Sequence, residues 1–304
     1  MKASFFRRYG GPEVLEYGEQ PEPTPRAGEL LIEIHAASIN AADWKMRSGH
    51  YGAAVSFPHI PGRDFSGVVV NRGAHFQPGD KVYGVCEVPR EGAYAEKIAI
   101  REAIVARRPE KLTDVQTAAI GLIGLTALIS IEETLQLKRG ETILIQGGAG
   151  GVAGFAIALA KHIGARVITT ASAANHDYVR KLGADEVIDY RSQDFTKAVK
   201  NVDAVFDTVG GDVTQQSFAV LKPGGRLASI AGGGTAPASP RTDVTSLRPK
   251  VDRDRPHLDR VAKLVSDGTI PLPQITEYPL AKAADAHRIS EARHLRGKLV
   301  LRVS

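Results

Sequence analysis

The sequence predicts an α/β fold in which a doubly wound parallel sheet follows a β-rich first part. Three observations predict this fold class. From Glu141 onward, short apolar runs alternate with helical segments, as they do in parallel sheets covered by helices. Residues 1–110 instead carry strand-like runs separated by turn residues, and we expect no helix of useful length before Thr113. Between Glu141 and Gly164, a strand, a glycine-rich turn and a helix follow one another.

In the β-rich part, the expected strands are apolar or alternating runs bounded by turn residues. They cover residues 30–36, 67–71 and 81–86 and a pair that ends at residue 100, with a turn at residues 78–80. The sequence Thr-Asp-Val-Gln at Thr113 then predicts a capped helix start. Small apolar residues from Ala118 to Leu128 predict helices buried at a domain junction.

In the second part, strands and helices alternate, and Gly164 is placed to stop the first helix. The expected strands cover residues 142–146, 165–170, 186–189, 202–207 and 225–230, and the expected helices cover 152–163, 176–182 and 212–221. Later segments are a loop over 232–249 with a short strand near 244–247, an amphipathic helix over 256–268, and a helix over 282–293. The last run, from Gly297, is expected to rejoin the β-rich part as a strand. The expected domains are 1–120 and 121–265, with a C-terminal return over 266–304.

The glycine-rich turn is typical of a dinucleotide site. Its residues Gly148, Ala149, Gly150, Gly151, Val152 and Ala153 fit G-x-G-x-x-G/A, with alanine at the third place. Without side chains, the backbone can turn sharply, approach a pyrophosphate and present helix N-terminal N–H groups to it. The alternative is a turn that serves packing alone. The position between a strand and a helix favours the dinucleotide site.

The end of the second strand of this sheet favours NADP over NAD. A ribose 2′-hydroxyl is usually bound by an acidic residue about 20 residues past the turn, but no carboxylate occurs here before Asp177. Ser172 and Asn175, with His176 or Arg180, can instead donate to a 2′-phosphate. The alternative is that Ser172 and Asn175 only cap the next helix.

The composition excludes several classes of protein. The 304 residues are 43% hydrophobic and 24% charged, which is a soluble globular balance. A single cysteine, Cys86, excludes an internal disulfide and a zinc site built on several thiolates. We expect no stretch long enough to span a bilayer, no membrane partner and a cytoplasmic location. The net charge of +5 is scattered and lacks interleaved aromatic residues, which argues against a nucleic-acid site.

A series of motifs covers nearly the whole chain, namely residues 9–15, 40–49, 60–67, 78–82, 92–96, 124–127, the glycine turn, 181–185 and 297–301. In this order they resemble the medium-chain dehydrogenase/reductase superfamily, specifically its zinc-lacking quinone oxidoreductase branch. The resemblance implies a GroES-like catalytic domain fused to a Rossmann domain that binds NADP, usually in a homodimer. It also implies reduction of quinones or α,β-unsaturated carbonyls with NADPH.

Departures from the zinc-dependent relatives imply that no metal is bound. Those relatives carry a cysteine near the position of Asn40 and Gly-His-Glu at residues 62–64, where this chain has Gly-Arg-Asp. His50 and His59 are near in sequence, but a catalytic zinc generally needs three protein ligands held by further hydrogen bonds. Alcohol oxidation, which relies on a Lewis acid, is therefore disfavoured.

The resemblance assigns cofactor contacts beyond the turn. Asn40 and Thr126 would hold the nicotinamide, Gly297-Lys298 would close over the cofactor, and Tyr190 resembles the family's tyrosine beside the 2′-phosphate. The complete expected set is Asn40, Thr126, Gly148, Ala149, Gly150, Gly151, Val152, Ser172, Asn175, Tyr190, Ile230, Ala231, Gly297 and Lys298.

The expected catalytic residues are Asn40, Tyr51, Lys45 and Arg63, as polar groups around the substrate. Each has an alternative role: Asn40 could stabilise a turn, Tyr51 could shield the cleft, and Lys45 or Arg63 could form structural ion pairs. Asp43 is expected to orient a neighbour or cap a helix rather than to transfer a proton.

Without a metal, hydride from nicotinamide C4 can reach an electron-poor carbon if positioned donors meet the developing negative oxygen. The expected function is therefore NADPH-dependent, zinc-independent reduction of a quinone or enone, with a small molecule as the partner. Two alternatives remain open. One is a trans-enoyl thioester reductase, and the other is a non-enzymatic, NADPH-linked RNA-binding protein.

Overall fold

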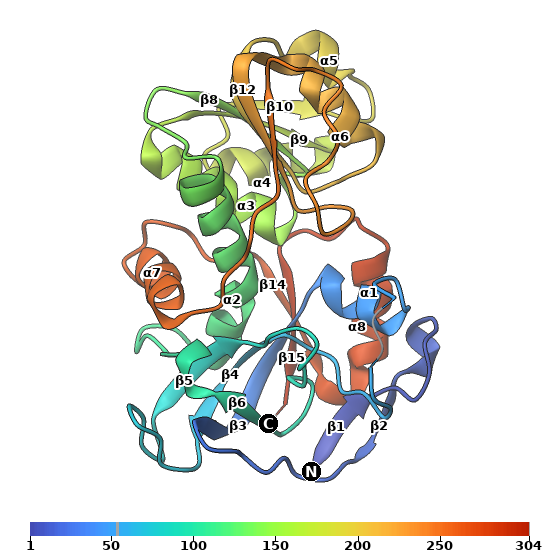
Figure 1. Cartoon of the computed structure of the whole chain (residues 1–304), viewed down its shortest axis with the longest axis vertical. Helices are drawn as coiled ribbons and strands as arrows, with labels where there is room; N and C mark the ends of the chain where they lie inside the picture. Colours follow the sequence, from blue (N-terminus) through green and yellow to red (C-terminus); the bar gives the residue numbers. More distant parts are fainter. Residues whose placement is uncertain (53–54, 304) are drawn as a thin grey trace. The chain divides into compact units, whose positions relative to one another are not determined.

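The computed structural model describes residues 1–52 and 55–303, which divide into two compact units (Figure 1). Unit 1 consists of Met1–Leu122, Arg253–Ser266 and Leu272–Ser304, and unit 2 consists of Ile123–Asp252 and Asp267–Pro271. Each unit has its own hydrophobic core, built on the inner faces of its sheet. The predicted α/β fold class, with a β-rich part and a parallel sheet, is confirmed.

Unit 1 is organised around β3 (Glu29–Ile39), the longest strand of a seven-stranded sheet. One edge of β3 pairs with β4 (Asp64–Val69), and the other pairs with β6 (Lys97–Arg101) and then with β15 (Lys298–Arg302), all antiparallel. Figure 1 shows the red strand β15 beside the blue β3, which confirms that the last strand returns to the β-rich part. The strands β5 (Lys81–Val85), β7 (Val105–Arg107) and β14 (Ile275–Pro279) complete this sheet. The strands β1 (Lys2–Phe5) and β2 (Glu16–Glu19) pair with each other in a separate two-stranded sheet.

Helix α1 (Ala41–Arg47) shows that the expectation of no useful helix before Thr113 was wrong. The Asp43 side chain accepts the backbone N–H of Asn40 at 2.8 Å, which caps the helix as expected for Asp43. α1 also packs on α8 (Ala283–Glu291), as Figure 1 shows. So short a helix depends on tertiary packing, which periodicity in the sequence does not reveal.

Helix α7 (Arg255–Ser266) belongs to unit 1, whereas the expected domain bounds placed residues up to 265 with the nucleotide-binding part. The hydroxyl of Tyr83 donates to the carbonyl of Leu258, and the Arg255 guanidinium donates to the carbonyls of Val105 and Glu102, both at 3.0 Å. These contacts tie α7 to β5 and β7. The short 3-10 turns of the unit are η1 (Pro12–Val14), η2 (Glu102–Ile104) and η6 (Leu280–Lys282).

Helix α2 (Asp114–Leu128) begins in unit 1 and continues into unit 2, where the π-helical turn η3 (Ile129–Thr134) follows. The predicted cap is confirmed: Thr113 Oγ1 accepts the N–H of Gln116 at 3.2 Å, and Gln116 Oε1 accepts the N–H of Thr113 at 3.0 Å. The segment Asp114–Thr134 has the length and hydropathy of a membrane span, which corrects the expectation that no stretch reaches that length. However, 83% of its apolar window is buried inside the protein, as in a core helix.

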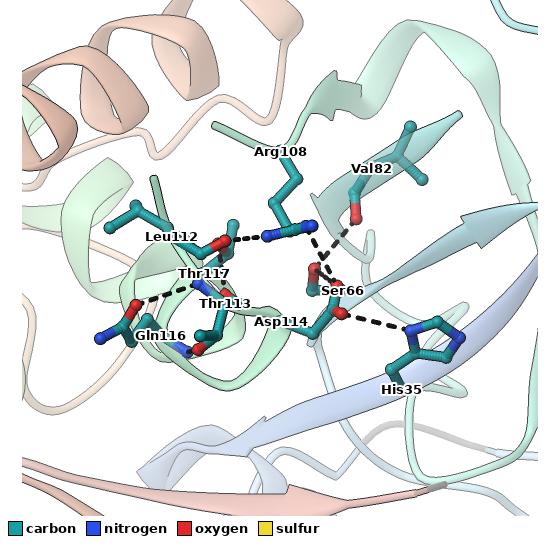
Figure 2. A network of polar contacts seen from close by, with 9 residues as sticks. All are labelled: His35, Ser66, Val82, Arg108, Leu112, Thr113, Asp114, Gln116 and Thr117. Atoms are coloured by element: carbon teal, nitrogen blue, oxygen red, sulfur yellow. Dashed lines mark hydrogen bonds and ion pairs between the residues drawn. The ribbon is translucent and has the colours of Figure 1, made fainter. Parts of the chain in front are cut away.

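Asp114, in the first turn of α2, joins the helix to the sheet of unit 1 (Figure 2). Its Oδ1 accepts the Ser66 hydroxyl at 2.7 Å and lies 3.4 Å from Nε of Arg108, and its Oδ2 lies 3.2 Å from Nδ1 of His35. A carboxylate in the first turn also interacts favourably with the helix dipole. The start of α2 is therefore fixed by polar contacts to β3, β4 and the residue after β7.

Unit 2 contains a parallel six-stranded sheet with the order β10-β9-β8-β11-β12-β13, so the strand order reverses between β8 and β11. Figure 1 shows helices α3, α4, α5 and α6 packed along it. α3 is terminated by Gly164, which follows its last residue in a left-handed conformation, and a short strand covers 245–247, both as predicted. The elements are β8 (Thr142–Gln146), α3 (Gly151–Ile163), β9 (Arg166–Ala171), η4 (Ala173–Asn175), α4 (His176–Lys181), β10 (Glu186–Asp189), α5 (Phe195–Ala198), β11 (Val202–Asp207), α6 (Asp212–Ser217), η5 (Phe218–Val220), β12 (Leu221–Ser229) and β13 (Thr245–Leu247).

Candidate active site

In unit 1, Asn40 lies where β3 ends and α1 begins, and charged groups hold both ends of its amide. The Lys298 ammonium donates to Asn40 Oδ1 at 2.8 Å, and Asn40 Nδ2 donates to Asp64 Oδ2 at 2.8 Å. Lys298 is the first residue of β15 and Asp64 the first of β4, the two strands that flank this end of β3. All three side chains are buried, at 8% exposure or less. The strand register therefore brings these groups together.

Every oxygen of the Asp64 carboxylate has a donor. Besides the Asn40 amide, its Oδ2 accepts the Ser38 hydroxyl at 2.5 Å, and its Oδ1 accepts the backbone N–H of Leu122 at 2.7 Å. A fully buried carboxylate requires this degree of hydrogen bonding to offset its desolvation. Asp64 is thus a fixed structural charge beside Asn40.

Asp43 is the second carboxylate next to Asn40. Its Oδ2 accepts the backbone N–H of Asn40 at 2.8 Å and the Tyr94 hydroxyl at 2.9 Å. Its Oδ1 is buried and has no hydrogen-bond partner among residues 1–52 and 55–303. Burial raises the pKa of Asp43 to about 7, against the opposing charge of Arg63. Asp43 is therefore poised to change its charge near neutral pH.

Tyr94 continues this polar chain toward α8. Nε2 of His287 lies 3.3 Å from the Tyr94 hydroxyl, and Nδ1 lies 3.3 Å from Nη1 of Arg47, which also forms an ion pair with Glu291. Because a guanidinium can only donate, Nδ1 accepts, and Nε2 carries the ring proton toward Tyr94. Burial and the charge of Arg47 lower the pKa of His287 to about 3, so the imidazole is neutral at physiological pH.

Of the other expected catalytic residues, Arg63 and Tyr51 lie close to each other. The Arg63 guanidinium donates to Oε1 of Glu91 at 2.9 and 3.0 Å and lies 6.0 Å from the centroid of the Tyr51 ring. This ion pair matches the alternative role left open for Arg63. Tyr51 is 44% exposed. The Lys45 ammonium lies over the neighbouring Trp44 ring, 5.7 Å from its centroid.

In unit 2, the glycine turn connects β8 to α3, as predicted. A Cβ at Gly148 would lie 2.3 Å from Thr169 Oγ1, so only glycine fits between the turn and β9. Gly150 precedes the helix, and α3 begins at Gly151. The first N–H groups of a helix lack intrahelical acceptors and favour anions. The turn can therefore hold a pyrophosphate at the N-terminus of α3.

Residues expected to bind a 2′-phosphate meet at one edge of this sheet. Ala171 and Asp189 are register partners at the ends of β9 and β10, so Ser172 and Tyr190 follow paired strand ends. The Asn175 amide donates to the Ser172 hydroxyl at 3.2 Å. Tyr190 is 49% exposed. Hydroxyl and amide groups thus occupy the place where an acidic residue would hold a ribose 2′-hydroxyl.

The remaining expected cofactor residues lie in two other places. Ile230 and Ala231 follow β12, and the Arg248 guanidinium fixes this loop by donating to the carbonyls of Ser229 and Ala231 at 3.0 and 2.8 Å. Thr126 lies on α2 within unit 2 and is 7% exposed. That Thr126 holds the nicotinamide, and that Ile230 and Ala231 contact the cofactor, stay predictions.

Sequence reasoning missed several residues of these clusters. Asp207, at the end of β11, accepts the N–H groups of Val209 and Gly210 at 2.8 and 3.1 Å, and its place at the carboxyl end of a parallel strand was a usable signal. Asp64 and Tyr94 both lie within the motifs at residues 60–67 and 92–96 that carry the family resemblance. His287 carries no local signal, because its partner Tyr94 lies 193 positions away in the sequence.

Comparisons with known proteins agree with this arrangement. Residues 26–110 match the alcohol dehydrogenase GroES-like domain family, and residues 182–301 match the zinc-binding dehydrogenase family. The chain is 33% identical over 315 residues to the chloroplastic NADPH-dependent alkenal/one oxidoreductase of Arabidopsis thaliana, covering 99% of this chain and 79% of that protein.

Solved structures of quinone oxidoreductases are similar to the whole chain. The enzyme from Coxiella burnetii is 35% identical with a TM-score of 0.91, over 100% of this chain and 99% of that chain. The Escherichia coli enzyme, solved in complex with NADPH, is 29% identical with a TM-score of 0.91, over 100% of both chains.

The zinc in the name of one matching family has no matching ligand set here. Within the part of the chain that the structure describes, no group of three or more His, Cys, Asp or Glu side chains could hold a metal ion. Asn40 is bound by Lys298, and the Arg63 guanidinium, which cannot be a ligand, pairs with Glu91. These residues do not fit a catalytic zinc.

Proposed function

Because the chain belongs to the medium-chain dehydrogenase/reductase family, in its quinone oxidoreductase branch, we propose that it reduces quinones or α,β-unsaturated carbonyls with NADPH and without zinc. Membership makes it an NAD(P)H-dependent quinone or alkenal oxidoreductase. Family membership does not decide between NADPH and NADH or exclude zinc, so both parts of the proposal rest on residues of this chain.

The residues that follow β9 support the proposal that the cofactor is NADPH. Ser172 and Asn175 offer donors there, while a carboxylate would repel a 2′-phosphate. The bound cofactor supplies the hydride. The turn at Gly148–Gly151 would hold its pyrophosphate, and Asn40 and Thr126 would orient its nicotinamide.

Positioning is the proposed main contribution of the protein to catalysis. Holding the acceptor against the nicotinamide can account for much of the rate, since quinones have a strong driving force for reduction. Tyr51 and Arg63 would line the acceptor side. A cytoplasmic homodimer completes the proposal and remains a prediction.

A labelled cofactor tests this function. NADPH deuterated at C4 should transfer its label to carbon when an enone is reduced. Turnover with a quinone, an enone and an enoyl thioester, each with NADPH and NADH, then ranks the acceptors. An enone product without deuterium on carbon would refute direct hydride transfer. RNA binding at physiological salt without turnover of any acceptor would favour the non-enzymatic alternative.

A further inference from the structure

The amide of Asn40 has one strongly preferred orientation. Its oxygen faces the Lys298 ammonium and its nitrogen faces the Asp64 carboxylate. Turning the amide by 180° would place NH₂ against the ammonium and the carbonyl oxygen against the carboxylate. Both contacts would then be repulsive in a buried site, where electrostatic interactions are stronger than in water.

The backbone before Lys298 also fixes the position of this residue beside Asn40. Gly297 has φ +71°, and a Cβ there would lie 2.1 Å from the carbonyl oxygen of Gln274, so only glycine allows this approach. The N–H of Lys298 donates to the same carbonyl at 2.8 Å. The tight turn therefore starts β15 in register with β3 and directs Lys298 to Asn40.

The Lys298 ammonium is already engaged within unit 1. It is 3% exposed and donates to the Ile39 carbonyl at 2.6 Å as well as to Asn40 Oδ1. Burial lowers its pKa, and the nearby charges of Asp64 and Asp43 oppose this shift. A buried ammonium with two carbonyl acceptors is poorly placed to reach a phosphate of the cofactor.

We propose that Lys298 is a positioning residue that, with Asp64, fixes the orientation of the Asn40 amide, and that it does not itself bind the cofactor. With its oxygen held by the ammonium, Asn40 meets its ligand as an N–H donor. This inference rests on the proposed function for its catalytic consequence. It replaces the closing role over the cofactor that the resemblance implied for Lys298.

The test separates positioning from cofactor binding. Lys298→Met should lower kcat about 10- to 100-fold, as small misplacements in active sites do, and should leave the Kd of NADPH within about threefold. Asn40→Ala should lower kcat similarly, and the double variant should lose little more, because Lys298 acts through Asn40. Lys282→Met, at an exposed lysine of the same unit, is the matched control.

Two outcomes overturn the proposal. One is a tenfold or greater rise in the Kd of NADPH for Lys298→Met at unchanged kcat. The other is a pair of losses that multiply in the double variant. If Lys298→Met leaves too much uncompensated charge to fold, Lys298→Met/Asp64→Asn removes both charges and is tested in the same way.

A measurement without turnover tests the contact between Lys298 and Asn40 separately from the proposed function. The Tm values of the Asn40→Ala and Lys298→Met variants and of their combination form a second cycle. Positioning predicts that the combined loss in Tm is smaller than the two single losses together, since each variant breaks the same contact. Additive losses in Tm refute that contact. Failure of the wild-type protein to reduce any acceptor refutes only the proposed function.

Discussion

The two units build their functional sites by opposite physical means. In unit 2, the turn at Gly148 works through backbone N–H groups and the absence of side chains, and its parts lie within a few residues of each other. In unit 1, Asn40 is held by charged side chains that lie 24 and 258 positions away in the sequence. The first kind of site depends on shape, and the second depends on the balance of buried charges. The two should therefore respond differently to pH and to small substitutions.

The largest expected effect is on the pH dependence of the unfolding free energy, and it tests the role of buried charge in unit 1 through Asp43. Its pKa is raised to about 7 from an ordinary 3.8, so the folded protein binds a proton that the unfolded chain has lost. This contribution to the free energy of unfolding is fully present below pH 3.8 and is lost as pH rises to about 7, in total roughly 4 kcal/mol. Asp43→Asn removes this titration but keeps an acceptor for Asn40 and Tyr94.

The measurement is the difference in unfolding free energy between the wild-type protein and Asp43→Asn, taken from urea titrations at several pH values between 4 and 8. The wild-type protein should lose stability relative to the variant as the pH rises. Groups far from Asp43 titrate equally in both proteins and therefore cancel in this difference. A difference that stays constant with pH would show that folding does not raise the pKa of Asp43.

The next effect tests the shape dependence of unit 2. Gly148→Ala forces the new Cβ against Thr169. Such overpacking shifts the surrounding backbone and side chains at a cost of roughly 1–3 kcal/mol. We expect NADPH to bind about 10- to 100-fold more weakly, measured by fluorescence titration. Gly18→Ala is the control, because a Cβ at Gly18 would be 3.7 Å from Phe5 at ordinary contact distance. Unchanged affinity in Gly148→Ala would argue against a close approach of the turn to the cofactor.

A smaller effect is expected when a negative charge is added at Ser172, where the 2′-phosphate is expected to bind in unit 2. Ser172→Asp should weaken NADPH about tenfold, equivalent to about 1.4 kcal/mol, through repulsion of the 2′-phosphate, and should spare NADH. Dissociation constants for both cofactors measure this preference. Equal constants for NADPH and NADH in the wild-type protein would contradict the assignment.

The last prediction is that removal of metal ions has no effect on activity. The Asn40 cluster takes its positive charge from Lys298 rather than from a metal ion, so a strong chelator should leave kcat unchanged. Elemental analysis should find no stoichiometric zinc. One zinc per chain that is lost together with activity would overturn this view of unit 1.

The same contrast explains what could be predicted from the sequence. The strands of unit 2, the turn at Gly148 and the cap at Thr113 are determined by neighbouring residues, and each was predicted. α1 was missed, because its stability comes from packing on α8 rather than from its own periodicity.

The cluster around Asn40 could be predicted only in part. Asn40 and Lys298 were both named, but with roles taken from the resemblance rather than from their contact. The contact depends on the register of β15 against β3, which no local pattern contains. Likewise, the place of α7 in unit 1 rather than unit 2 depends on hydrogen bonds made by Tyr83 and Arg255, which link distant segments.

The pairing of β15 with β3 has a consequence for protein synthesis. A ribosome produces the whole of unit 2 between these two strands, so one edge of β3 has no partner over residues 36–39 during that time. An unpaired edge is a template for pairing with other chains, whereas the sheet of unit 2 is complete once residue 247 has emerged. Translation that stops after unit 2 should therefore yield a nucleotide-binding unit that can fold, attached to a β-rich segment that aggregates.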